Sequence, residues 1–283
     1  METAKTLWEH LWERYRAHVS YARTYEEMIS AAGGTFINDH IAFRSLRLTL
    51  DGQDFGIGYL AQIAASLGYT PKDEYHFPHQ HLYARYYQHP DQTLPKLFIS
   101  ELIVEEMQMH IAEAIVKTVK NAKLATFAQT DPGSWLNIFG TPWLPPLKST
   151  VELVNTVSQY GAWVLLHGYG VNHFTGSVNH QNTPVYPDIE STAAGLAALG
   201  VPMKEVIEGS WGSGLRQTAT NAVNTLVMVR DDQSGQLVEI PWTYAYFEIA
   251  ERGMIENASG VKELFQGFLG QQAKQLFEMT KKA

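Results

Sequence analysis

The sequence contains no cysteine among its 283 residues. Disulfide bonds, iron–sulfur clusters and zinc sites with thiolate ligands are therefore excluded, because all of them need cysteine sulfur. Any metal ion that this protein binds must be held by His, Asp or Glu side chains. The chain offers 11 histidines for such a site.

Two further absences narrow the function. The formal net charge is −8 and no block of Lys and Arg residues occurs, which argues against nucleic-acid binding as the main function. No apolar run is long enough to cross a bilayer, and the N-terminus, Met1-Glu2-Thr3, opens no apolar signal segment. The composition, with 45% hydrophobic and 18% charged residues, is that of a globular protein. We therefore expect a soluble, cytoplasmic protein that binds neither nucleic acid nor membrane.

Hydrophobic periodicity predicts two halves with a similar order of elements. In the first half, about residues 1–130, spacings of three to four residues indicate helices and alternation indicates strands. The predicted elements are a helix at Lys5–Met28, a strand at Asn38–Arg44, a helix at Leu60–Leu67, strands at Tyr75–Gln88 and Leu97–Ser100, and a helix at Leu102–Val119. A Pro-rich connection, Pro142–Pro146, breaks regular structure after this half.

The second half, about residues 150–283, repeats this order. Its predicted elements are a short helix capped by Ser149-Thr150, a strand at Val171–Thr175, a helix at Asp188–Leu199, strands at Lys204–Glu208, Leu215–Asn221, Thr225–Arg230 and Trp242–Ile249, and a helical tail at Val261–Met279. The first strand of each half contains an Asn and a His. This weak internal repeat predicts a single domain, residues 1–283, built of two related modules that curl their sheets around a shared cavity.

The strand Asn38–Arg44 carries the first candidate site. Because side chains alternate along a strand, His40, Ala42 and Arg44 share one face, and Ile41 and Phe43 lie on the other. The Cα atoms of His40 and Arg44 would be roughly 13 Å apart. A metal ion on His40 and a carboxylate on Arg44 would then be opposite ends of one short dicarboxylate ligand. A histidine with a purely structural role is the alternative.

His173 and Glu248 are the other candidate ligands. His173 is the counterpart of His40 in the second half, and Glu248 lies in a strand that is otherwise apolar and aromatic. A buried carboxylate needs a positive partner. The alternatives are an exposed Glu248 on an edge strand, or a pair with Arg252. Together with His40, the two residues form a set of two histidines and one carboxylate, which is typical of non-haem Fe(II) sites.

Two other segments have the residue types of a binding site. His76, His79 and His81 cluster in the Tyr75–Gln88 segment, where His79 and His81 alternate onto one face. We favour the wall of a polar-aromatic cavity over a second metal site for this cluster. The glycine-rich loop Gly209–Gly214 lacks the lysine of a phosphate-binding loop. We expect it to let the backbone approach a ligand, with Arg216 and Gln217 near enough to donate hydrogen bonds. His167 is a weaker candidate to support the site.

Three motifs resemble one family. Asn38-Asp39-His40-Ile41-Ala42-Phe43-Arg44, Val171-Asn172-His173-Phe174-Thr175 and Tyr246-Phe247-Glu248-Ile249-Ala250-Glu251-Arg252-Gly253 are similar to segments of the DUF1338 proteins, which include enzymes that act on 2-oxoadipate in lysine breakdown. The resemblance implies an α+β fold like that of the vicinal oxygen chelate superfamily, in which paired β-α-β-β-β modules form a cup around a metal. It also implies that His40, His173 and Glu248 bind Fe(II), with Zn, Ni, Mn or Co as substitutes in a purified sample. Arg44 would bind the distal carboxylate of the substrate.

The same resemblance implies a reaction. A 2-oxo acid and O₂ would be the partners, and oxidative decarboxylation with hydroxylation of the neighbouring carbon would convert 2-oxoadipate to 2-hydroxyglutarate. Two alternatives remain at this point. One is a hydrolase, lyase or isomerase that uses the same metal cup without O₂, and the other is a small-molecule-binding module without turnover.

Overall fold

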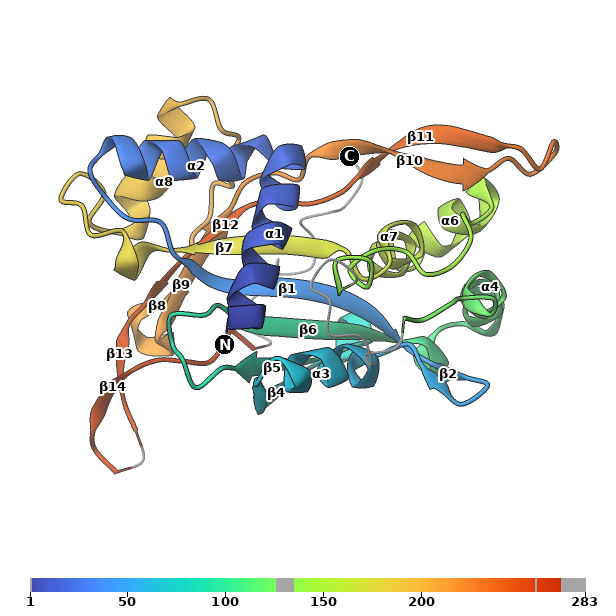
Figure 1. Cartoon of the computed structure of the whole chain (residues 1–283), viewed down its shortest axis with the longest axis horizontal. Helices are drawn as coiled ribbons and strands as arrows, with labels where there is room; N and C mark the ends of the chain where they lie inside the picture. The colour runs from blue at the N-terminus through green and yellow to red at the C-terminus, as the bar shows by residue number, and fades with distance from the viewer. Residues whose placement is uncertain (1, 126–134, 258, 271–283) are drawn as a thin grey trace.

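A curved mixed sheet of eight strands organises the molecule (Figure 1). The computed structural model describes residues 2–125, 135–257 and 259–270. Across the sheet the strand order is β4-β5-β6-β1-β7-β12-β9-β8. The strands are β1 (Asn38–Arg47), β4 (Thr70–Phe77), β5 (Leu82–Gln88), β6 (Lys96–Ile103), β7 (Val171–Ser177), β8 (Glu208–Ser210), β9 (Leu215–Ala219) and β12 (Glu248–Arg252).

The sheet consists of two modules with the same connectivity. The first runs β1, helix α3 (Ile57–Ser66), β4, β5 and β6, and the second runs β7, helix α8 (Ile189–Ala198), β8, β9 and β12. In each module the first and last strands are parallel neighbours, and the modules meet where β1 pairs with β7 in antiparallel fashion. The predicted fold class, paired β-α-β-β-β modules that form a cup, is confirmed.

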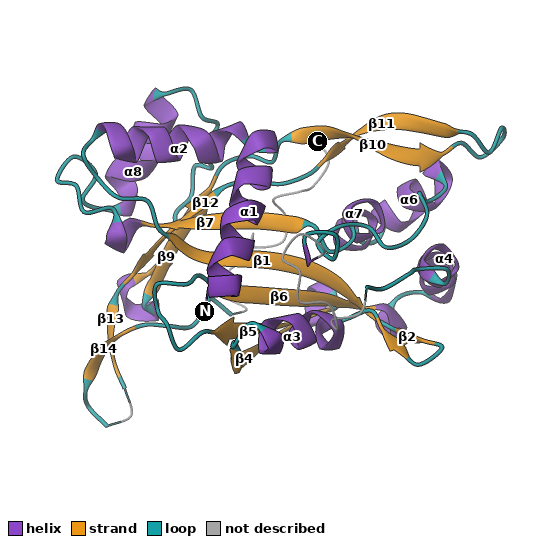
Figure 2. Cartoon of the chain, viewed as in Figure 1, coloured by secondary structure: helices purple, strands orange, loops and turns teal. Residues whose placement is uncertain are grey.

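Helices cover the sheet, and short ribbons extend from it (Figure 2). The remaining helices are α1 (Glu2–His18), α2 (Ser20–Ala31), α4 (Met109–Val119), α6 (Lys148–Asn155) and α7 (Gln159–His167). The ribbons pair β2 (Thr49–Leu50) with β3 (Gln53–Asp54), β10 (Asn224–Arg230) with β11 (Leu237–Thr243), and β13 (Met254–Glu256) with β14 (Lys262–Leu264). The β10–β11 ribbon is an insertion between β9 and β12 of the second module.

The two faces of the central strands have different roles. Aromatic side chains of α1 pack on one face, where Trp12 contacts Phe174 of β7 with ring centroids 5.1 Å apart and Trp8 contacts Phe43 of β1 at 6.4 Å. His40, Ala42 and Arg44 of β1 line a cavity on the other side of the sheet. The alternation predicted for this strand is therefore confirmed.

Several predicted boundaries are wrong, and most fail at turns. The helix at Lys5–Met28 is interrupted at Val19, and the Tyr75–Gln88 segment is a hairpin because the chain turns at Pro78–Gln80 and His81 adopts a φ of 55°. The helix expected from Leu102 begins only at Met109. The α6 helix begins after Leu147, and neither Ser149 nor Thr150 caps it.

The C-terminal half contains three further differences. The Lys204–Glu208 segment enters the sheet only at Glu208, and the predicted Trp242–Ile249 strand is divided, because β11 ends at Thr243 and β12 begins at Glu248. The helical tail predicted at 261–279 is wrong for residues 261–270, which contain β14 and an irregular segment. Residues 271–279 lie outside the described part of the chain.

Candidate metal centre

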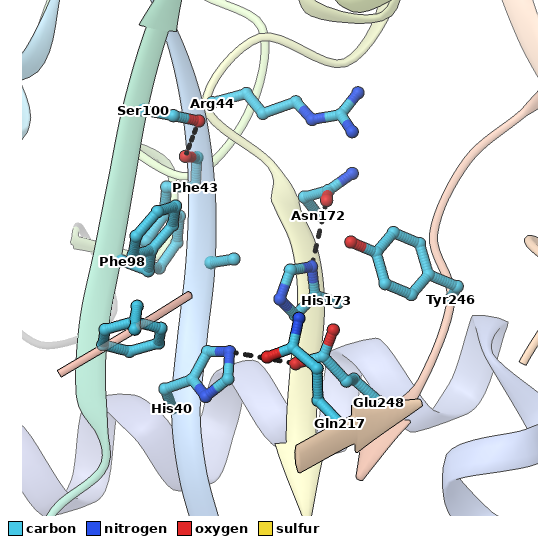
Figure 3. Close-up of a pocket in the computed structure, with 12 residues that line it drawn as sticks. His40, Phe43, Arg44, Phe98, Ser100, Asn172, His173, Gln217, Tyr246 and Glu248 are labelled. Carbon is cyan, nitrogen blue, oxygen red and sulfur yellow. Dashed lines mark hydrogen bonds and ion pairs between the residues drawn. The ribbon is translucent and has the colours of Figure 1, made fainter. Parts of the chain in front are cut away.

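The fold brings together His40, His173 and Glu248, which are far apart in the sequence. They come from β1, β7 and β12, neighbouring strands at the centre of the sheet (Figure 3). All three side chains are buried, and one ligand atom from each lies within 4.8 Å of the others. His40 Nε2 is 3.3 Å from Glu248 Oε1. The solvent-exposed edge strand considered for Glu248 is therefore wrong.

A β-bulge precedes each histidine. In the β1–β7 register, Asn38 and His40 face Gly176 and Thr175, so Asp39 is an extra residue on β1. Ala42 and Phe43 face His173 and Val171, so Asn172 is an extra residue on β7. A bulge re-aims a side chain that regular alternation would place on the opposite face. Each module therefore turns the residue before its histidine toward that histidine.

These re-aimed side chains orient the imidazole rings. His40 Nδ1 is 2.8 Å from Asp39 Oδ1, and His173 Nδ1 is 3.1 Å from Asn172 Oδ1. An acceptor at Nδ1 holds the proton on that nitrogen and leaves the Nε2 lone pair for a metal ion. Thr175 Oγ1 donates to Glu248 Oε1 over 3.2 Å and lies 3.0 Å from His40 Nε2.

Arg252 supports the first histidine through Asp39. Its Nε and Nη2 donate to the two carboxylate oxygens of Asp39 over 2.6 and 2.8 Å, in a buried bidentate pair. Burial alone would raise the pKa of Asp39, but the charge and hydrogen bonds of Arg252 hold this pKa well below its usual range. The pair with Glu248 considered for Arg252 is therefore wrong, because Asp39 is the carboxylate that Arg252 binds.

The electrostatics of the centre favour a cation near His40. Burial opposes protonation of His40, but Asp39 and Glu248 outweigh it and raise the pKa of this imidazole. The pKa of His173 is lowered well below its usual value by burial and then by the positive charges of His40 and Arg44. Two imidazoles and a carboxylate suit a divalent transition metal. The donor set therefore fits a divalent ion, which would replace the second proton of a protonated His40, at Nε2, while the proton on Nδ1 stays with Asp39.

Arg44 lies at the other end of the same cavity. Its side chain is 1% exposed, and its guanidinium lies 4.8 Å from the ring centroid of Tyr160 and 5.0 Å from that of Trp163. The cavity itself has a volume of about 20 Å³, room for about one water molecule. Its lining consists of His40, Ala42, Phe43, Arg44, Phe98, Ser100, Asn172, His173, Gln217, Tyr246, Glu248 and Phe268.

The other predicted site residues lie partly elsewhere. Gln217 lines the cavity, but Arg216 does not, because it pairs with Glu190 and stacks on Trp211. His76 and His79 are exposed around the β4–β5 turn, and His81 pairs with Glu106. None of the three histidines lines the cavity, so the predicted wall is wrong for them.

Sequence reasoning assigned no role in the site to several residues, among them Asp39, Asn172, Tyr246, Arg252 and Phe268. The repeated Asp-His and Asn-His pairs were visible, but adjacent residues of a regular strand point to opposite faces, and the bulges could not be foreseen. Phe268 packs edge-on against His40, with ring centroids 4.8 Å apart. It belongs to the segment for which the sequence predicts a helix. No pattern in the sequence therefore indicated that Phe268 would lie against His40.

His167 does not support the metal centre. It lies at the end of α7 between the rings of Trp163 and Tyr244, and its Nε2 is 3.1 Å from the carbonyl oxygen of Thr243. Burial lowers its pKa to about 4.

A lowered His167 pKa makes stability depend on pH. Between pH 6.5 and about 4 the unfolded chain binds a proton at this residue and the folded protein does not, so stability falls as the pH decreases. We expect the metal-free His167→Gln variant to lose less unfolding free energy than the wild type between pH 7 and pH 5. Urea unfolding of both proteins at the two pH values measures this difference, and equal losses would contradict the prediction.

Comparison with known proteins identifies the family of this chain. A family model described as 2-oxoadipate dioxygenase/decarboxylase matches residues 3–131 and 141–282. The chain is 30% identical over 242 residues to the chloroplastic 2-oxoadipate dioxygenase/decarboxylase of Arabidopsis thaliana, covering 80% of this chain and 61% of that protein. It is 29% identical over 252 residues to a plastid protein of the same name from Oryza sativa, covering 82% and 64%. The chain thus spans about three fifths of these relatives.

Solved structures show the same fold. A hydroxyglutarate synthase from Oryza sativa in complex with 2-oxoadipate matches with a TM-score of 0.81 and 25% identity, covering 99% of this chain and 94% of that one. A glyoxalase superfamily protein from Ralstonia eutropha matches with a TM-score of 0.80 and 22% identity, covering 95% and 86%. Within the described residues, no helix is long and apolar enough to span a membrane. Because the family model covers nearly the whole sequence, the chain belongs to the 2-oxoadipate dioxygenase/decarboxylase family.

Proposed function

We propose that this protein is an Fe(II)-dependent enzyme that oxidatively decarboxylates a 2-oxo dicarboxylic acid, with 2-oxoadipate as the substrate and 2-hydroxyglutarate and CO₂ as the products. One observation carries the proposal: the buried His40, His173 and Glu248 share a cavity with the buried cation of Arg44. The names of the relatives support the same activity.

His40, His173 and Glu248 would hold the metal ion, each through one ligand atom. Bound Fe(II) would supply chelation of the 2-oxo acid group and activation of O₂. The reaction then balances without another reductant: one O₂ and one 2-oxoadipate give one CO₂ and one 2-hydroxyglutarate. Of the two oxygen atoms, one ends in the new C1 carboxylate and the other in the hydroxyl group.

Arg44 would bind the distal carboxylate and so select dicarboxylic acids. A guanidinium presents two parallel N–H donors to a carboxylate, and its charge persists at any physiological pH. The rings of Tyr160 and Trp163 hold this cation in place. A ligand with a second carboxylate at the right distance would therefore bind more tightly than its monocarboxylic analogue.

The walls of the cavity would exclude bulk water. Phe98, Tyr246 and Phe268 contribute aromatic surface around the histidines. A volume of about 20 Å³ is too small for a dicarboxylic acid, so wall residues must move when the ligand binds. Phe268, in the irregular segment that follows β14, packs edge-on against His40 and is one of these wall residues.

The test is O₂ uptake by protein loaded anaerobically with Fe(II). We expect 2-oxoadipate to start O₂ uptake matched one-to-one by CO₂ release, with 2-hydroxyglutarate as the product by mass spectrometry. 2-Oxohexanoate, which lacks the distal carboxylate, should react far more slowly. If iron is bound and no 2-oxo acid starts O₂ uptake, the oxidative function is wrong and a non-oxidative metal enzyme replaces it.

A further inference from the structure

The side-chain amide of Asn172 uses its oxygen to orient His173 and leaves its nitrogen, Nδ2, available for another contact. The residue is 2% exposed and lines the cavity. Its Oδ1 lies 3.1 Å from His173 Nδ1, and within the described residues its Nδ2 is buried without a hydrogen-bond partner. Figure 3 shows the amide between His173 and Arg44. A buried N–H donor without an acceptor is costly, which suggests that a ligand supplies the acceptor.

The chemistry of the centre fixes the orientation of this amide. His173 can bind a metal ion through Nε2 only if the proton is on Nδ1. The atom of Asn172 that faces Nδ1 must then be the acceptor Oδ1, because an NH₂ group would confront another N–H. Both hydrogens of Nδ2 are therefore directed away from His173.

The equivalent residue of the first module shows what is distinctive about Asn172. Asp39 occupies the corresponding bulge, and its two carboxylate oxygens are both used, one by His40 and Arg252 together and the other by Arg252 alone. Arg252 thus pairs with Asp39 Oδ2, the carboxylate oxygen that His40 does not use. The corresponding atom of Asn172, Nδ2, faces the cavity instead, on the side toward Arg44.

We propose that Asn172 Nδ2 donates a hydrogen bond to an oxygen of the bound 2-oxo acid, so that Asn172 both positions His173 and binds the substrate. This inference rests on the proposed function. It also gives a reason for the amide: a carboxylate at this place would still accept from His173 Nδ1, but it would repel an anionic ligand and offer it no donor.

Two substitutions separate the roles of the residue. Asn172→Asp keeps an acceptor for His173 and removes the donor, whereas Asn172→Leu is uncharged and removes both. We expect each variant to bind 2-oxoadipate at least about tenfold more weakly than the wild type, as loss of a hydrogen bond to a charged group predicts. Only Asn172→Leu should also bind the metal about 10- to 100-fold more weakly, because loss of a residue that orients a ligand has this effect.

The measurements need no turnover. Metal affinity is obtained with Co(II) by competition with a chelator, and 2-oxoadipate affinity by anaerobic calorimetry on protein saturated with Co(II). Asn221→Asp, on the exposed loop between β9 and β10, is the control for an added charge and should bind both as the wild type does. Both Asn172 variants lose the Nδ2 donor. Only Asn172→Asp adds a charge, and only Asn172→Leu loses the acceptor that orients His173, so weaker 2-oxoadipate binding in both variants reports the loss of the donor.

The outcomes are distinct. If Asn172→Leu binds 2-oxoadipate within twofold of the wild type, the inference is wrong and the proposed function stands. If Asn172→Leu does not fold, an unchanged 2-oxoadipate affinity in Asn172→Asp likewise shows that the inference is wrong while the proposed function stands. If the wild type saturated with Co(II) binds no 2-oxoadipate, the proposed function fails and the inference fails with it.

Discussion

Replacement of Glu248 by glutamine is expected to lower the metal affinity of the protein by more than about 100-fold. Glu248 is 3% exposed and is the only carboxylate among the three clustered ligand residues. Glutamine has nearly the same shape but presents no anionic oxygen, so the fold should persist while the ion loses its charged ligand. Loss of residues that merely orient a ligand already costs 10- to 100-fold in metal affinity, and loss of the ligand itself should cost more.

Metal content after dialysis, measured by mass spectrometry, tests this expectation. His40→Ala should show the same loss, because it removes an imidazole of the same set. His79→Ala is the matched control, since this histidine is exposed in the β4–β5 turn and outside the cavity. Full metal content in both Glu248→Gln and His40→Ala would refute the assignment of the centre.

Replacement of Arg44 by methionine is expected to preserve metal binding and to weaken 2-oxoadipate binding by about 100-fold. The estimate is a lower bound, because hydrogen bonds to charged groups contribute about 1.5–3 kcal/mol each and a bidentate pair contains two of them. Methionine fills much of the volume between Tyr160 and Trp163 without offering a donor or a charge. Arg44→Lys should recover only part of the affinity, because an ammonium group cannot bind a carboxylate bidentately.

The comparison of two ligands makes this prediction specific. 2-Oxohexanoate has the same chelating group as 2-oxoadipate and no distal carboxylate, so its affinity should be nearly equal in the wild type and Arg44→Met. Arg216→Met is the control for loss of an arginine, because Arg216 pairs with Glu190 outside the cavity. An equal loss of affinity for both ligands would show that Arg44 acts on the metal end or on the fold, and would contradict its assigned role.

The local sequence pattern alone was sufficient to predict which face of β1 carries the candidate site. Period-two alternation is a property of any strand, so His40, Ala42 and Arg44 could be placed together before any tertiary contact was known. The α3 and α8 helices were equally predictable, since each has an apolar stripe that ends at a glycine. Absence of cysteine likewise restricted metal ligands to His, Asp and Glu.

The local sequence pattern could not predict where the turns fall or which strands pair over long range. The β4–β5 hairpin turns inside a segment that alternates like one strand, and β11 and β12 divide a segment of the same kind. In both cases the local pattern is compatible with two structures, and the pairing partner decides between them. The irregular path of residues 265–270 depends in the same way on contacts from Arg252 to the carbonyl oxygens of Phe265 and Gly267.

Residue types thus determined which chemistry the chain can support, and the tertiary structure decided how it is arranged. The meeting of β1, β7 and β12 brings the candidate ligand residues together across more than 200 positions of sequence, from His40 to Glu248. The two bulges then turn Asp39 and Asn172 toward the histidines, which no alternation rule predicts because a bulge is an exception to alternation. Their hydrogen bonds at Nδ1, and the buried Asp39–Arg252 pair behind one of them, exist only in the folded sheet.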